Sequence, residues 1–124
     1  MDYVRQLDIV APDLLAATHI DLVGLGGIGS PTGLLLTKMG CQDIRVFDGD
    51  LVEEVNLASQ IYRLEDATQG TEKAVACQSI WTEFSGISVE AVVARVQDQA
   101  LRGIVILAVD SNAARNAIWE RCLR

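Results

Sequence analysis

Short apolar runs alternate with longer stretches of mixed polarity along most of the chain. Four short runs are expected to be strands: Ile20–Leu25 and Ile104–Val109, which are mainly apolar, and Asp43–Asp48 and Ile87–Val93, in which apolar residues are mixed with charged ones. Short runs of this kind are typical of strands that are buried in a parallel sheet. The run over Ile104–Val109 is apolar throughout, so we expect it to lie near the centre of the sheet.

The stretches between these runs carry the end signals of helices. A short helix is expected over Pro12 and Leu14–Thr18. A longer helix has Ser30 as its N-cap, Pro31 in its first turn and Gly40 at its C-terminal end. These residue types are favoured at those positions, so we expect the helix to begin and end there.

Two further helices are expected nearer the C-terminus, one over Thr71–Phe84 and one from Ser111 onward. Apolar residues recur along one side of each, as in helices that pack on a core. These residues are Ala74, Cys77, Trp81 and Phe84 in the first helix, and Ala114, Ala117, Ile118 and Cys122 in the second. The strand–helix alternation predicts an α/β fold: a Rossmann-like, mostly parallel sheet with helices on both faces and right-handed crossovers.

The chain has 124 residues, enough for one domain with one core. Gly49–Gly70 is a long, polar and irregular connection, and such connections are often functional. Four strands are few for a doubly wound domain, and no glycine cap precedes Arg124. We therefore expect residues 1–124 to form a single domain that is the N-terminal portion of a longer fold, or that a partner completes.

Composition narrows the classes of function. Ten basic and seventeen acidic residues give a net charge of −7, which disfavours nucleic-acid binding because phosphate contacts need clustered Lys and Arg. No apolar run approaches the roughly 20 residues of a membrane span, and the N-terminus lacks a signal-peptide pattern. We expect a cytoplasmic protein without membrane contact. Cys41, Cys77 and Cys122 form no CxxC pair, and we expect all three to be small buried hydrophobes.

A glycine turn follows the first apolar run. Gly24, Gly26 and Gly29 fit G-x-G-x-x-G between a strand and a helix, and Asp48 ends the next run. This pattern brings backbone N–H groups to a phosphate and an acid to ribose hydroxyls. It predicts a nucleotide site; the alternative is that the glycines only allow the strand and the helix to pack closely. Gly-Lys-Ser/Thr is absent from the sequence, so the turn is not a P-loop.

The segment after the second apolar run indicates which nucleotide is bound. Together with the glycine turn it resembles the ThiF/MoeB family, the adenylating domain shared with ubiquitin-activating enzymes. The family pattern is Y-x-R-Q before the first strand, a glycine turn, an aspartate pair, V-x-x-x-N-L-x-R-Q, a D-x-G-x-x-K helix start and a later aspartate. The matching positions are Tyr3, Arg5, Gln6, Gly24–Gly29, Asp48, Asp50, Val52, Asn56, Leu57, Gln60, Asp66, Gly70, Lys73 and Asp110. They cover nearly the whole chain in order.

The resemblance implies that the domain binds ATP and Mg²⁺ and adenylates the C-terminal carboxylate of a ubiquitin-like or sulfur-carrier protein. It implies that Asp48 binds the ribose and that Asn56 and Lys73 contact phosphates. Asp110 would hold Mg²⁺, and Arg5 would reach the γ-phosphate from the neighbouring subunit of a homodimer or heterodimer. The implied nucleotide-binding positions are Gly24, Gly26, Gly27, Gly29, Asp48, Asp50, Asn56, Gln60 and Lys73, and the implied catalytic positions are Arg5, Lys73 and Asp110.

Each role has a simpler alternative. Lys73 can be a solvated surface charge, although the macrodipole disfavours a cation in the first turn of a helix. Asp110 can cap the last helix together with Ser111, and Asn56 can form an Asx turn. The remaining alternatives are an ordinary surface position for Arg5 and a loop cap for Asp50. We expect His19 to be exposed at the entrance of a strand and to have no role.

One position departs from the family pattern. The sequence reads NLASQ, so Ser59 stands where the family has an arginine that faces the phosphates. Loss of a planar, permanent charge weakens phosphate binding. Either Arg63 substitutes for it, or activity is reduced, or the domain binds nucleotide without efficient turnover. Two alternatives stay open: a non-catalytic nucleotide-binding or scaffolding subunit, and an NAD(P)-dependent oxidoreductase domain, which the glycine turn alone would favour.

Overall fold

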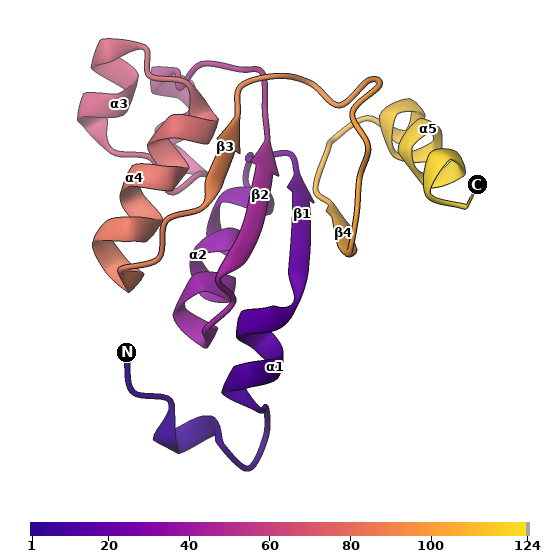
Figure 1. The fold of residues 1–124 in the computed structure, drawn as a ribbon. Helices are drawn as coiled ribbons and strands as arrows, with labels where there is room; N and C mark the ends of the chain where they lie inside the picture. The colour runs from indigo at the N-terminus through magenta and orange to yellow at the C-terminus, as the bar shows by residue number, and fades with distance from the viewer. Residues whose placement is uncertain (124) are drawn as a thin grey trace.

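A computed structural model describes residues 1–123 of the chain. Within these residues, four strands form one sheet in the order β3–β2–β1–β4 (Figure 1). The strands are β1 (His19–Val23), β2 (Asp43–Phe47), β3 (Glu90–Val92) and β4 (Ile104–Leu107). Each neighbouring pair is parallel. The predicted α/β fold with a Rossmann-like parallel sheet is confirmed.

Five α-helices and two short 3₁₀ helices connect the strands in the described residues. They are η1 (Val4–Gln6), α1 (Pro12–Ala17), α2 (Gly29–Met39), η2 (Glu54–Ala58), α3 (Leu64–Gln69), α4 (Lys73–Ser85) and α5 (Asn112–Cys122). Figure 1 shows α2 and α4 together on one side of the sheet and α5 apart from them, beyond β4. The segment with η1 and α1 lies below the amino ends of the strands. None of the helices within residues 1–123 combines the length and apolar character that a membrane crossing requires.

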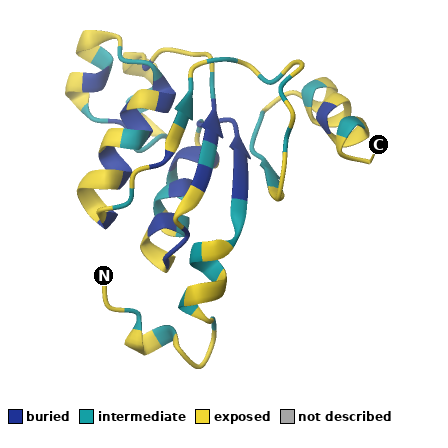
Figure 2. Ribbon diagram, viewed as in Figure 1, coloured by how far each residue is buried: buried dark blue, intermediate teal, exposed yellow. Residues whose placement is uncertain are grey.

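Side chains alternate between the two faces of the sheet, as in any strand. Ile20 and Leu22 of β1 belong to the larger core cluster, which packs under α2 and α4. Val23 belongs to a smaller cluster with Phe47 of β2 and Ile118 of α5 on the other face. Figure 2 shows the buried residues concentrated in β1, β2 and the helices that cover them. The larger cluster therefore supports the sheet, and the smaller one lies near the carboxyl ends of the strands.

Helices α2 and α4 approach closely because position 33 has no side chain. Gly33 lies in the middle of α2, and a Cβ atom there would stand 2.0 Å from Cη2 of Trp81 in α4. Trp81 is fully buried, and its indole N–H donates to the carbonyl of Ser30 at 3.2 Å. A glycine that weakens an isolated helix is thus explained by the packing of the indole ring against the α2 backbone.

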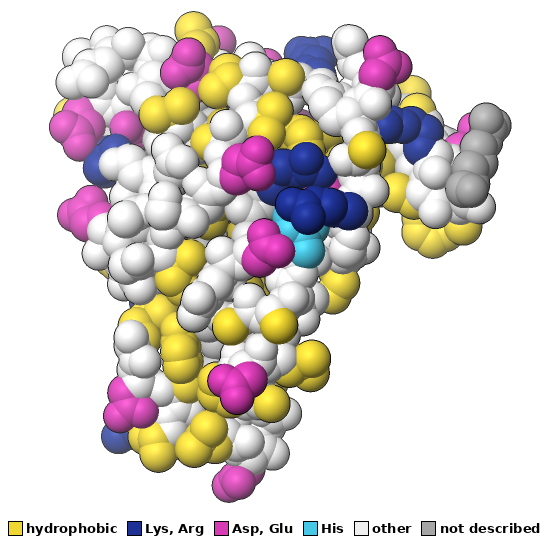
Figure 3. All heavy atoms as spheres, in the orientation of Figure 1, with side chains coloured by type: hydrophobic (Ala, Val, Ile, Leu, Met, Phe, Trp, Pro, Cys, Tyr) yellow, Lys and Arg dark blue, Asp and Glu magenta, His cyan; other side chains and the backbone are white. Residues whose placement is uncertain are grey.

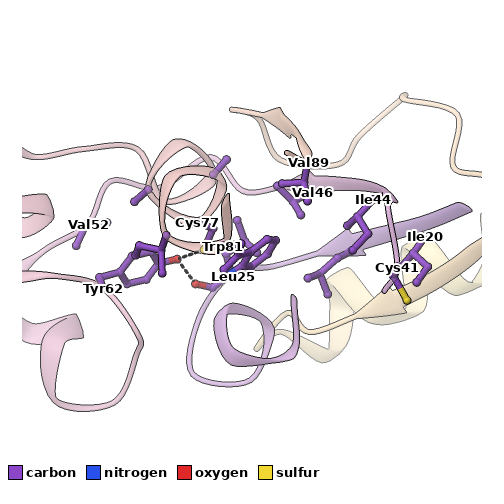
Figure 4. Close-up of a cluster of buried hydrophobic side chains, with 14 residues drawn as sticks. Ile20, Leu25, Cys41, Ile44, Val46, Val52, Tyr62, Cys77, Trp81 and Val89 are labelled. Carbon is purple, nitrogen blue, oxygen red and sulfur yellow. Dashed lines mark hydrogen bonds between the residues drawn. The ribbon is translucent and has the colours of Figure 1, made fainter. Parts of the chain in front are cut away.

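The connection Gly49–Gly70 is less irregular than the sequence suggested, because η2 and α3 lie within it. It is anchored to the larger core cluster by Tyr62. Figure 4 shows the Tyr62 hydroxyl between Leu25 and Cys77. This hydroxyl donates to the Leu25 carbonyl and accepts from the Cys77 thiol at 3.5 Å. Burial raises the pKa of Cys77 to about 12 and raises the pKa of Tyr62 far above its ordinary value, so both groups stay neutral at physiological pH.

The predicted central position of the fourth strand is wrong. Among residues 1–123, β4 pairs with β1 alone and lies at an edge of the sheet, and Ile104 is 54% exposed. Strand β1 is interior because both β2 and β4 pair with it. An apolar run predicts that a strand is largely covered, but strand order depends on the path of the crossovers, which leaves no local signal in the sequence.

Three local predictions are also wrong. Helix α2 begins at Gly29, so Ser30 lies inside its first turn, where its buried hydroxyl donates to the carbonyl of Gly26 at 2.6 Å. A serine hydroxyl can bond backward along the helix as well as cap it, and the sequence does not distinguish the two. Phe84 is 60% exposed and Cys122 is exposed as well, because both lie near the ends of helices, beyond the part that packs on the sheet.

Candidate functional site

A cavity of about 380 Å³ opens at the carboxyl ends of β1, β2 and β4, where open parallel sheets bind ligands. The predicted site positions that line it are Gly24, Gly26, Gly27, Asp48, Asp50, Gln60, Lys73 and Asp110. Its apolar wall includes Val23, Phe47, Val96, Val109 and Ile118. The cavity therefore joins an apolar wall to a charged one, which is the usual make-up of a small-molecule site.

The glycines of the turn have two different roles. Gly24 has a φ of +95°, and a Cβ atom there would stand 2.7 Å from the carbonyl oxygen of Ala108. A Cβ on Gly29 would stand 1.8 Å from the carbonyl oxygen of Gly24. These two positions need glycine for close packing, which is the alternative that the sequence left open. Gly26 and Gly27 line the cavity, and a Cβ on either would meet no protein atom closer than 3.4 Å.

Helix α2 starts directly behind this turn without a side-chain cap. The first N–H groups of an uncapped helix have no partner within the helix and carry a partial positive charge. The backbone over Gly26 and Gly27 thus presents a polar, sterically open surface to the cavity. Such a surface suits an anion, phosphate included.

Asp48 fixes the geometry of the turn. Its Oδ2 accepts the N–H of Leu25 at 2.9 Å, and its Oδ1 accepts the N–H of Asp50 at 2.8 Å. One carboxylate therefore ties the end of β1 to the chain that leaves β2. Each oxygen keeps a second acceptor site, since a carboxylate offers about four in total, so Asp48 can also accept from hydroxyl groups of a ligand in the cavity.

Lys73 is the first residue of α4 and is only 7% exposed. Its backbone N–H donates to the carbonyl of Asp50 at 3.0 Å, which holds the helix start against the end of β2. Its ammonium lies 5.9 Å from the ring centroid of Tyr62. In the described part of the chain it has neither a carboxylate partner nor a side-chain hydrogen bond. A buried cation that lines a cavity in this way is a strong candidate for binding an anionic ligand.

The structure shows which of the two adjacent residues Asp110 and Ser111 caps α5. Ser111 is the N-cap of α5, and its Oγ accepts the N–H of Ala114 at 3.3 Å. The Asp110 carboxylate is exposed to the cavity and receives no hydrogen bond from residues 1–123. Capping therefore falls to Ser111. A free carboxylate in the same cavity as the glycine turn suits Mg²⁺, which usually takes one or two carboxylates together with phosphate oxygens.

Three predicted positions lie outside the cavity: Arg5, Gly29 and Asn56. Arg5 is exposed in η1, at the opposite end of the sheet (Figure 1). The Asn56 Oδ1 accepts the N–H of Glu53 at 2.8 Å, which closes the first turn of η2. This contact matches the loop-stabilising alternative for Asn56. The Gln60 Oε1, by contrast, is buried beside the cavity and has no hydrogen-bond partner within the described residues.

Arg63 does not reach the cavity. It forms a two-pronged ion pair with Asp66 at 3.0 Å and lies 3.5 Å from both Glu65 and Glu83. Burial alone would raise the pKa of Asp66, but the hydrogen bonds from Arg63 outweigh it and lower that pKa. Arg63 therefore stabilises the start of α3 through its pairing with Asp66. Its contacts do not support the alternative in which it substitutes for the arginine that the family has at position 59.

The sequence reasoning missed Arg95 and Gln97, which line the cavity from the chain that follows β3. No motif marks them. The signal that could have found them is position alone, because residues just after a strand of a parallel sheet lie at its ligand-binding edge.

A second polar cluster lies on the face of the sheet opposite α2 and α4, away from the cavity. Asp21 is fully buried and accepts from Arg45 at 2.8 and 2.9 Å, from the backbone N–H of Arg102 at 2.8 Å and from His19 at 2.8 Å. Burial raises the pKa of Asp21, but these hydrogen bonds outweigh it and hold that pKa below its ordinary value. Figure 3 shows the histidine among basic and acidic side chains. The prediction that His19 is exposed and has no role is wrong.

Comparison with known proteins agrees with this geometry. The ThiF family profile matches residues 3–124. The SAMP-activating enzyme E1 of Haloferax volcanii is 32% identical over 103 residues, which is 80% of this chain and 38% of that protein. The sulfur carrier protein ThiS adenylyltransferase of Escherichia coli K12 is 28% identical over 134 residues, covering 99% of this chain and 53% of that protein.

A solved structure of a related protein is also similar to this chain. The E. coli tRNA N6-threonylcarbamoyladenosine dehydratase TcdA, in complex with ATP, is 30% identical with a TM-score of 0.82, covering 98% of this chain and 54% of that one. This chain thus spans between 38% and 54% of the length of these relatives.

Proposed function

The chain belongs to the ThiF family, and from this premise we propose that it binds ATP and Mg²⁺ in the cavity and adenylates the C-terminal carboxylate of a ubiquitin-like or sulfur-carrier protein. The names of the relatives favour this class of acceptor: one activates SAMP and another adenylylates ThiS. The ATP in the TcdA complex favours the nucleotide.

The observation that carries the proposal is the placement of Lys73. It is a nearly buried cation, with no carboxylate partner in residues 1–123, at a helix start where the macrodipole disfavours it. It lines the same cavity as the open backbone of Gly26 and Gly27. A ligand with several negative charges accounts for this combination, and a triphosphate is such a ligand.

In the proposed reaction, a carboxylate oxygen of the acceptor forms a bond to the α-phosphorus of ATP. The bond from that phosphorus to the bridging oxygen of the β-phosphate breaks, and pyrophosphate leaves with the electron pair. Lys73 and the glycine turn would hold the phosphates, and Asp48 would hold the ribose. Asp110 would hold Mg²⁺, which offsets the charge that builds up on the leaving group.

The role proposed for Arg5 has to take account of its position away from this cavity. Arg5 is exposed at the other end of the sheet, so within one subunit it does not line the site. We propose that it reaches the phosphates of a neighbouring subunit in a dimer. Light scattering that gives a strictly monomeric protein under conditions of full activity would overturn this role.

The runner-up is a non-catalytic nucleotide-binding or scaffolding subunit. It is favoured by Ser59, which is exposed and lies outside the cavity lining, and by the commitment of Arg63 to Asp66. An NAD(P)-dependent oxidoreductase is favoured only by the glycine turn and Asp48, and it leaves Lys73 without an explanation.

Two measurements separate these readings. Isothermal titration calorimetry with ATP·Mg²⁺ and with NAD⁺ tests the nucleotide, and we expect heat of binding for ATP·Mg²⁺ only. Exchange of labelled pyrophosphate into ATP, with a carrier protein that ends in a free carboxylate, tests adenylation. Binding of ATP without exchange would favour the scaffolding subunit, and binding of NAD⁺ without ATP would overturn the proposal.

A further inference from the structure

The described lining of the cavity carries more acidic than basic side chains, although the proposed ligand is an anion. Among the described lining residues the carboxylates are Asp48, Asp50 and Asp110, while Lys73 and Arg95 are the cations. A triphosphate carries several negative charges. In the proposed site Lys73, Mg²⁺ and the N–H groups of the glycine turn share their neutralisation, and Arg95 is the further lining cation in residues 1–123 that can contribute. The family pattern would supply a cation at position 59, where this chain has serine.

Arg95 is held at the cavity by contacts of its backbone and stem. The carbonyl of Val92 accepts N–H groups from Asp48 (3.2 Å) and Ala94 (3.0 Å), which turns the chain after β3 toward the end of β2. There a Cβ atom on Gly49 would stand 3.2 Å from Cγ of Arg95 and 3.3 Å from its backbone nitrogen. The glycine at position 49 thus allows this segment to lie directly against the aspartate pair.

The guanidinium of Arg95, in contrast to its stem, is almost free. Its side chain is 80% exposed, and it lies 3.6 Å from the Asp50 carboxylate, which is 59% exposed. At this separation the pair shares charge but no aligned hydrogen bond, and exposed pairs of this kind contribute little to stability. The five N–H donors of the guanidinium therefore remain available at the rim of the cavity.

We propose that Arg95 is a phosphate-binding residue of this site, which exchanges its weak pairing with Asp50 for charge-assisted hydrogen bonds to the bound nucleotide and supplies the positive charge that Ser59 does not. This inference rests on the proposed function. It concerns a residue that matches no position of the family pattern, and it assigns to the chain after β3 a task that the family gives to the loop after β2.

The test measures affinity by isothermal titration calorimetry for ATP·Mg²⁺, ADP·Mg²⁺ and adenosine, with wild type, Arg95→Gln and Arg102→Gln. Arg102 is the matched control, since it is an exposed arginine just before β4, at the opposite end of the sheet. We expect Arg95→Gln to weaken ATP and ADP binding about tenfold, the usual effect of losing a charge-assisted hydrogen bond. Adenosine binding should stay unchanged, and Arg102→Gln should match wild type for every ligand.

The outcomes separate this proposal from the one on which it rests. If wild type binds ATP·Mg²⁺ and Arg95→Gln binds it equally well, Arg95 is a surface residue and the assignment is wrong, while the proposed function stands. If adenosine binding falls as much as ATP binding, Arg95 contacts the nucleoside and not the phosphates, which also overturns the assignment. If wild type binds no adenine nucleotide, the proposed function falls first, and the role of Arg95 falls with it.

Discussion

Replacing Lys73 by methionine should stabilise the free protein and weaken its response to ATP. Methionine has nearly the length of lysine and fills irregular space, so the change removes the charge and leaves most of the packing. The ammonium opposes the macrodipole of α4, at a cost of roughly 0.3–1 kcal/mol, and its burial at 7% exposure adds to that cost. The Tyr62 ring offsets only part of it, because 5.9 Å is near the limit for a cation–π contact.

The net gain on removing the charge is therefore about 1 kcal/mol, which corresponds to a rise in Tm of about 4 °C for a domain of this size. ATP at one hundred times the wild-type Kd should add about 2.7 kcal/mol to wild type. Loss of a charged phosphate contact worth about 2 kcal/mol raises the Kd roughly thirtyfold. The same ATP concentration should then add only about 0.9 kcal/mol to Lys73→Met.

Thermal and urea unfolding, each with and without ATP·Mg²⁺, measure both effects. Lys38→Met is the matched control, because Lys38 is exposed in the last turn of α2, where the macrodipole favours a cation, and lies 5.8 Å from the Phe84 ring. It should lower stability slightly and leave the ATP response intact. A Lys73→Met protein that is less stable than wild type and keeps its full response to ATP would show that Lys73 is structural, and the reasoning would be refuted.

Three further predictions follow from individual contacts. Asp21→Asn should lower the free energy of unfolding at pH 7 by about 3 kcal/mol, because it leaves Arg45 without its buried carboxylate. The pKa of Asp21 is lowered in the folded state, so this stabilisation is present above about pH 4 and is lost as pH falls through the folded-state pKa. A difference between the two proteins that does not shrink in acid would contradict this reasoning. Gly33→Ala should destabilise by about 2 kcal/mol in urea unfolding despite its better helix propensity, because the new methyl group collides with Trp81; a neutral or stabilising result would contradict this packing. Asp110→Asn should remove most Mg²⁺-dependent pyrophosphate exchange while stability stays within about 0.5 kcal/mol, since Ser111 caps α5; unchanged exchange would exclude Asp110 as the metal ligand.

The parts of this fold that were predictable from sequence are those with local or family-wide signals. The apolar runs located the strands, and the glycine turn and Asp48 located the cavity, because the turn geometry and the strand end are local properties. The order of the sheet was not predictable, since β4 is apolar whether it lies at the centre or at an edge. The placement of Phe84 failed for a related reason: helical periodicity shows which side of a helix is apolar but not how far along that side the packing extends.

The site divides in the same way. The sequence indicates Lys73 as a candidate ligand-binding residue, because the macrodipole disfavours a cation at the start of a helix. It does not indicate Arg95, because nothing about an arginine after a short strand is anomalous until Gly49 is seen to lie against it. The choice between Asp110 and Ser111 as the helix cap also needed coordinates, since both residue types are good caps and they are adjacent in the chain.

The long connection after β2 explains why motif residues that are far apart in sequence lie at one place. It leaves the cavity at Asp50 and returns at Lys73, and the two ends are joined by the hydrogen bond from the Lys73 N–H to the Asp50 carbonyl and by the bridge between Leu51 and Glu72. Asp66 holds α3 through Arg63, and Asn56 closes η2. Asn56 and Asp66 therefore act on the cavity indirectly. They stabilise the fold of the connection after β2, which fixes where α4 starts and so where the buried Lys73 ammonium lies.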